Sequence, residues 1–146
     1  MRITSEMNDY DVVYMVNPNY SRSPIYSAIS NDAPYKSYIG FCNDAIDLTP
    51  ISTTSCKSQE ILLIFNSTPF RSLGMLVDTL MDIRSSHPTY TVILLNDQFT
   101  GVDYGIERIS ICDLSLPDTV GITRFLEHLP IARANNSYWR DVSLKS

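Results

Sequence analysis

The chain has 146 residues, of which 44% are hydrophobic and 18% are charged, and its formal net charge is −5. This length suits one domain, and the composition is that of a globular protein and not of a disordered one. The eleven Lys and Arg residues are scattered, so we expect no direct nucleic-acid binding, which usually needs a basic face. The apolar runs are too short to span a bilayer and the N-terminus has no apolar signal core, so we expect a cytoplasmic protein without membrane contact.

The cysteines and glycines give no sign of a bound metal or cofactor. Cys42, Cys56 and Cys112 are odd in number and widely spaced, without the spacing of a zinc site. None of the five glycines follows an apolar run as part of a phosphate-binding loop. We therefore expect reduced thiols, no metal site and no cofactor.

The first third of the chain alternates between polar segments and short apolar runs. Residues 11–16 (DVVYMV) are mostly apolar and stop at an Asn-Pro pair, which is typical of a strand buried on both faces. Pro24 can begin a helix of about three turns, and residues 37–42 predict a second strand. Residues 43–59 show weak periodicity, and we expect a loop with one short helix there.

The middle of the chain has the clearest pattern. Residues 60–65 and 90–95 are apolar runs that predict the third and fourth strands. Between them, Ser67 or Thr68 can cap a helix that begins at Pro69, and a His-Pro pair ends that helix. The apolar residues of this helix recur at intervals of three and four, as in an amphipathic helix: Phe70, Leu73, Val77, Leu80 and Ile83.

The last third predicts one more strand and one more helix. Residues 97–106 contain two glycines and predict a connection or a very short helix. Residues 108–112 (RISIC) predict the fifth strand. Polar residues within 115–118 can cap a final helix, which Pro130 ends. The apolar stripe of this helix is Val120, Ile122, Phe125, Leu126 and Leu129.

Strands that are apolar throughout and alternate with helices predict a parallel sheet covered on both faces. We therefore predict an α/β fold with a five-stranded parallel sheet in a three-layer, flavodoxin-like sandwich. The domain spans residues 10–130, between a flexible N-terminus at 1–9 and a C-terminal tail or linker at 131–146. Ligands of such folds bind at the carboxyl ends of the strands, where we expect Asn17, Asn66, Asn96 and Cys112 with their neighbours.

The segment from residue 61 to residue 97 combines an apolar strand, a proline-started helix, an Ile-Arg pair, a His-Pro pair and a second apolar strand. The residues that form this pattern are Pro69, Ser72, Leu80, Ile83, Arg84, His87, Pro88 and Val92 to Leu95. The pattern resembles the centre of response-regulator receiver domains of the LuxR/NarL type, and the coarse match covers about residues 10–130. The resemblance implies the receiver fold, which is the five-stranded sandwich predicted above.

The positions that carry receiver chemistry depart from the family pattern. A receiver binds Mg²⁺ through acids after its first strand, phosphorylates an aspartate after the third, and uses a Ser/Thr and a Lys after the fourth and fifth. The corresponding positions here hold Asn17-Pro18, Phe65 or Asn66, Asn96, and Cys112 or Asp113. Amides are poor Mg²⁺ ligands and no nucleophiles for phosphoryl transfer. We therefore predict a degenerate phosphoacceptor pocket.

The resemblance and its departures together suggest a role. We expect a phosphorylation-independent pseudo-receiver that acts as a protein-interaction or dimerisation module in transcriptional regulation and is not an enzyme. Its partner would be a second copy of the chain or another transcriptional regulator. About 17 residues follow Leu129, too few for a helix-turn-helix domain, so the output domain is absent or the chain is a fragment. The alternative is a small α/β enzyme or nucleotide-binding domain with a site at the strand carboxyl ends.

Four residues near the C-terminus are candidates for a protein interface. Ile122, Phe125 and His128 bracket possible contact positions on the last helix. Trp139 is an aromatic residue in an otherwise polar segment, which suggests that it docks onto the domain or onto a partner.

Overall fold

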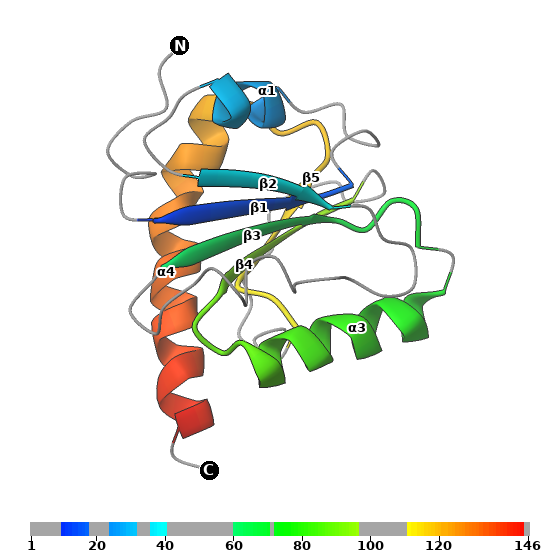
Figure 1. Ribbon diagram of the computed structural model, residues 1–146, viewed down its shortest axis with the longest axis vertical. Helices are drawn as coiled ribbons and strands as arrows, with labels where there is room; N and C mark the ends of the chain where they lie inside the picture. Colours follow the sequence, from blue (N-terminus) through cyan, green and yellow to red (C-terminus); the bar gives the residue numbers. More distant parts are fainter. Residues whose placement is uncertain are drawn as a thin grey trace.

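The computed structural model describes residues 10–17, 24–31, 36–40, 60–70, 72–96 and 111–144. These residues contain a five-stranded sheet in which every neighbouring pair is parallel, in the order β2-β1-β3-β4-β5 (Figure 1). Its strands are β1 (Val12–Val16), β2 (Lys36–Gly40), β3 (Ile61–Asn66), β4 (Thr91–Asn96) and β5 (Leu114–Pro117). The predicted parallel α/β architecture is confirmed, and the strand order is consistent with flavodoxin-like topology.

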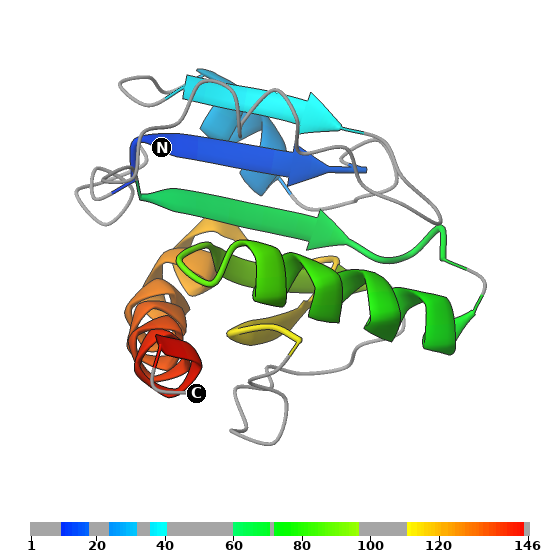
Figure 2. The ribbon, with the colours of Figure 1, turned by 60° about the horizontal axis from the view of Figure 1, so that its bottom comes forward.

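Helices cover both faces of the sheet because both faces of its strands are apolar. The helices α1 (Ile25–Asn31) and α4 (Ile122–Leu144) pack on one face, against Val13, Met15, Leu62, Ile64, Ile93 and Leu95. The helix α3 (Leu73–Ser86) packs on the other face, against Val12, Tyr14, Val16, Leu63, Phe65, Val92 and Leu94 (Figures 1 and 2). The alternation of these residues is the two-residue period of a strand.

Two helices differ from the prediction, one in its length and one in its start. The helix after Pro24 has seven residues and is shorter than expected, although its first bond, from Ala28 N–H to the Pro24 carbonyl, begins where predicted. The cap of α3 is Ser72, whose Oγ accepts from the Met75 N–H at 3.3 Å. The predicted cap at Ser67 or Thr68 and start at Pro69 are wrong.

Ser67 cannot cap the helix because its backbone N–H and its hydroxyl group bond to strand β4. Its N–H and its hydroxyl both donate to the Leu95 carbonyl of β4, at 2.8 and 3.1 Å. The Thr68 N–H donates to Asn66 Oδ1 at 3.0 Å, which forms an Asx turn. These bonds extend the end of β3 before the helix begins.

The fifth strand lies later in the chain than predicted. Of the predicted residues 108–112, only Ile111 and Cys112 are described, and they precede β5 without belonging to it. The strand pairs Leu114 with Ile93 and Leu116 with Leu95. Both leucines are fully buried, so pairing with β4 in this register removes their apolar surface from water.

The last helix does not end at Pro130, as predicted, but continues to Leu144. Proline in a helix removes one backbone hydrogen bond and disfavours the helix. Here Pro130 lies on the exposed face, while Ala132 and Asn136 beyond it are buried. Packing of the second half of α4 therefore outweighs the proline, and residues 131–144 are docked helix and not the predicted tail.

Some predictions fall outside the described residues. These concern the flexible segment 1–9, the loop and helix at 43–59, and the connection at 97–106. Within the described part, no helix combines the length and the apolar character that a bilayer span requires.

Candidate functional site

The predicted site at the carboxyl edge of the sheet brings three asparagines and one aspartate together. Asn17, Asn66 and Asn96 lie at the ends of β1, β3 and β4, which are neighbours in the sheet. Asn17 Nδ2 donates to the Asn66 carbonyl at 3.1 Å, and Asn66 Nδ2 donates to Asp118 Oδ1 at 3.3 Å. Asn17, Asn66 and Asp118 are all buried.

Further bonds tie the ends of β3, β4 and β5 to one another. Asn96 Nδ2 donates to Ser67 Oγ at 2.8 Å, and the Asp118 N–H donates to the Asn96 carbonyl at 3.1 Å. With the Ser67 and Asn66 bonds described above, this forms a carboxyl-edge network of Asn17, Asn66, Ser67, Asn96 and Asp118. Its polar groups bond to one another, as most buried polar groups do.

Asn17 adopts a backbone conformation that few side chains tolerate. Its φ is 58°, in the left-handed region, where asparagine is one of the few non-glycine residues found regularly. Asn17 directly follows β1, and its side-chain amide donates to the carbonyl at the end of β3. Pro18, its predicted companion, lies outside the described residues.

The other predicted pocket residues do not join this network. Phe65 is fully buried within β3 and packs against Phe70, with 5.5 Å between ring centroids, so the position at the strand end is that of Asn66. Cys112 and Asp113 precede β5 and therefore lie at the amino edge of the parallel sheet. Their inclusion in the pocket was wrong because the fifth strand was misplaced.

Asp118 occupies the edge position that the sequence analysis missed. It directly follows β5, as Asn66 and Asn96 end β3 and β4. The sequence Leu114-Ser-Leu116 alternates between apolar and polar residues as a strand does and ends at Pro117, so it could have predicted this strand end.

A second buried polar cluster lies at the opposite, amino edge of the sheet. Arg84 and Asp113 form a two-pronged ion pair, with Nη2–Oδ1 at 2.6 Å and Nη1–Oδ2 at 3.0 Å, and neither side chain is exposed. Arg84 Nη1 also donates to the Tyr90 carbonyl at 3.2 Å, and the Val92 N–H donates to Asp113 Oδ2 at 2.8 Å. The pair thus joins α3 to the starts of β4 and β5.

The electrostatics of this ion pair balance two opposing effects. Burial disfavours the charged carboxylate and raises the pKa of Asp113 from 3.8 to about 6, against the lowering effect of the Arg84 charge.

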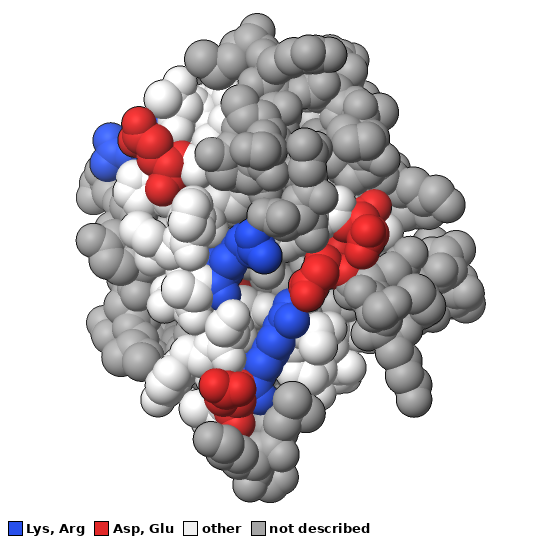
Figure 3. All heavy atoms as spheres, turned by 90° about the vertical axis from the view of Figure 1, so that its left-hand side faces the viewer, with Lys and Arg blue, Asp and Glu red and all other residues white. Residues whose placement is uncertain are grey.

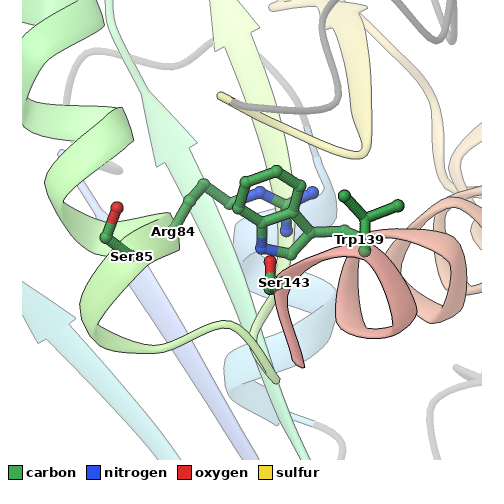
Figure 4. Close-up of a pocket in the computed structure, with 5 residues that line it drawn as sticks. Arg84, Ser85, Trp139 and Ser143 are labelled. Atoms are coloured by element: carbon green, nitrogen blue, oxygen red, sulfur yellow. The ribbon is translucent and has the colours of Figure 1, made fainter. Parts of the chain in front are cut away.

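The Trp139 ring lies over Arg84, with the guanidinium carbon 5.0 Å from the ring centroid (Figure 4). Trp139 therefore docks onto the domain, as one reading of the sequence suggested.

The second half of α4 is anchored to the same edge. Asn136 Nδ2 donates to the Tyr90 carbonyl at 2.8 Å. Arg140 donates to Glu60 through both terminal nitrogens, at 3.2 and 2.7 Å, and to Asn136 Oδ1 through Nε at 2.7 Å. Among the residues that the structure describes, basic and acidic side chains alternate along this side of the molecule (Figure 3).

The remaining predicted interface residues differ in their exposure. Phe125 is 0% exposed and belongs to the core, so its assignment to an interface is wrong. Ile122 packs partly against the core, and His128 is half-buried with Nδ1 2.8 Å from the Arg124 carbonyl oxygen. For Ile122 and His128, a contact with a partner stays a prediction.

Within the described residues, no group of three His, Cys, Asp or Glu side chains is arranged to hold a metal ion. No family model matches this chain, and no curated protein or solved structure is significantly similar to it.

Proposed function

We propose that this chain is a receiver-like module that accepts no phosphoryl group and acts through protein contacts in transcriptional regulation. The sheet order β2-β1-β3-β4-β5 fits the receiver fold that the segment 61–97 suggests. The observation that carries the proposal is the carboxyl-edge network, which puts amides where a receiver needs acids.

Phosphoryl transfer at this edge would need a nucleophile and carboxylate ligands for Mg²⁺. Asn66 ends β3 and so holds the phosphoacceptor position of a receiver. Its side-chain amide already bonds to Thr68 and Asp118. Asn17 holds the position of the metal-binding acids and bonds to the end of β3. Both amides are chemically unsuited to the reaction and are used to hold the strand ends together.

Beryllofluoride with Mg²⁺, which mimics a phosphoryl group, tests this proposal. Amide NMR spectra of the uniformly ¹⁵N-labelled protein should show no saturable shifts at Asn66, Ser67 or Asn96. The variant Asn66→Asp is the matched control, because it restores the acid but not the Mg²⁺ ligands, and we expect it to stay inert as well. Saturable shifts of the edge residues in the unmodified protein would contradict the proposal.

The same spectra discriminate the enzyme or nucleotide-binding alternative. Such a site at the strand ends would place ligand atoms against the side-chain amides of Asn66 and Asn96. A titration with ADP and Mg²⁺ that shifts these amide signals would favour the alternative. We expect no change, because those amides donate to Asp118 and Ser67.

A further inference from the structure

A hollow lies where the C-terminal end of α3 meets the second half of α4 (Figure 4). It has a volume of about 300 Å³ and is lined by Arg84, Ser85, Trp139, Val142 and Ser143. Arg84 and Trp139 are held by the buried ion pair and by the stacking described above. The floor of the hollow is therefore rigid and preformed, which favours binding because little ordering is needed.

Exposed apolar side chains lie on the two helices that line this hollow. Four large hydrophobic residues of the described part are 44% to 49% exposed, and all of them lie on α3 or α4: Met75, Met81, Tyr138 and Val142. Val142 lines the hollow, Tyr138 is one turn before it, and Met81 is one turn before Ser85. We call the lining residues together with Met81 and Tyr138 the α3–α4 corner.

Among the described residues, the unpaired charges near the corner are acidic. The described cations there are paired, Arg84 with Asp113 and Arg140 with Glu60. Asp78 and Asp82 lie on the same stripe of α3 as Ser85, and Asp141 precedes Val142. These three aspartates are exposed, and none forms an ion pair with another residue that the structure describes.

We propose that the α3–α4 corner is a docking surface for a basic amphipathic helix of a partner protein. A hollow of mixed lining, with exposed apolar side chains on both of its helices and exposed acids beside it, complements a helix that carries apolar residues on one face and Lys or Arg beside them. Exposed methionine and aromatic side chains are typical of surfaces that accept such helices. The inference rests on the proposed function in taking the chain to act through protein contacts, and it names the surface and the partner chemistry.

A synthetic Leu/Lys peptide of about 14 residues with helical periodicity, roughly 21 Å long as a helix, is the probe. Binding is followed by the fluorescence of the single tryptophan and by the NMR signal of the Trp139 indole N–H. We expect saturable binding that weakens as salt is added. A Leu/Glu peptide of the same pattern and a scrambled Leu/Lys peptide should bind much more weakly.

Two variants test the surface, with a matched control. Met81→Lys and Val142→Lys should each weaken binding about tenfold, because each replaces an apolar contact with a like charge. Met75→Lys changes a methionine of the same helix and almost the same exposure, but it lies near the far end of α3, and its affinity should stay within about twofold. Urea unfolding of each variant shows whether it is folded, and Val142→Lys supplies the test independently of Met81→Lys.

Three results of the peptide experiments would overturn the docking surface. These are no binding of the Leu/Lys peptide, equal affinities of Met81→Lys, Val142→Lys and Met75→Lys, or equal binding of the Leu/Glu peptide. Self-association of the protein that Met81→Lys abolishes would assign the corner to a second copy and would also overturn it. Beryllofluoride binding at the carboxyl edge would defeat the proposed function alone, since the peptide experiments do not involve that edge.

Discussion

The buried ion pair makes a prediction about how stability depends on pH. In the unmodified protein the pKa of Asp113 is about 6, above its ordinary value of 3.8. A carboxyl whose pKa is raised by folding stabilises the folded state fully below pH 3.8, and this contribution is lost as the pH rises through about 6. Above about pH 6, Asp113 is ionised in both the folded and the unfolded states, so its contribution no longer changes.

The variant Arg84→Met should extend this pH dependence upward. It removes the charge that lowers the pKa of Asp113, so the Asp113 carboxyl of the folded protein stays protonated up to a higher pH. Each pH unit then costs about 1.4 kcal/mol, and the stability gap to the unmodified protein should widen by up to about 3 kcal/mol between pH 6 and pH 8. At pH 8 the total loss should reach about 3–5 kcal/mol, the usual cost of breaking a buried ion pair.

Urea unfolding at pH 6, 7 and 8, followed by tryptophan fluorescence and circular dichroism, measures this gap. The double variant Arg84→Met/Asp113→Asn is the control. Its asparagine carries no charge and its Oδ1 can still accept from the Val92 N–H, so the added pH dependence should vanish. Stability curves of Arg84→Met and the unmodified protein that run parallel from pH 6 to pH 8 would refute the reasoning.

Three further predictions concern local structure. Asn17→Val should lower the unfolding free energy by about 2 kcal/mol or more, because a β-branched residue is strained at a φ of 58°; Asn17→Gly, measured in the same urea titrations, should lose less. Pro130→Ala should raise the midpoint of thermal unfolding, by restoring a helical hydrogen bond at an exposed site worth about 1–3 kcal/mol. Ser72→Ala should cost about 1 kcal/mol through loss of the α3 cap, whereas Ser86→Ala at the other end of α3 should be nearly neutral by the same measurement.

The sequence was sufficient for the architecture because the central strands are apolar on both faces. Three apolar runs predict buried parallel strands, and the structure confirms them: residues 11–16, 60–65 and 90–95. The segment from residue 108 to residue 117 was ambiguous, since it contains two short apolar runs. Only pairing with β4, which buries Leu114 and Leu116, selects the second run.

The site residues were harder to predict because their partners are far apart in sequence. Ser67 has the local features of a helix cap, yet its N–H and its hydroxyl both donate to the Leu95 carbonyl. Arg84 appeared only as part of a family pattern, and nothing in its neighbourhood indicated the pair with Asp113, 29 residues away. Pro130 predicts a helix end by local rules, and the packing of Ala132 and Asn136 overrides it.

The two polar clusters lie at opposite edges of the sheet, which bears on whether a signal passes between them. Under the proposed function no phosphoryl group binds at the carboxyl edge, so this edge should not control the proposed docking surface. The bonds at this edge hold the ends of β3, β4 and β5 in one arrangement. Asn96→Ala removes the bond to Ser67 and should lower stability by about 1 kcal/mol. The affinity of this variant for the Leu/Lys peptide should stay within about twofold of the unmodified protein, because distant independent sites act additively. A change of about fivefold or more, a coupling of about 1 kcal/mol, would mean that the edge and the α3–α4 corner are linked and that the module responds to its own strand ends.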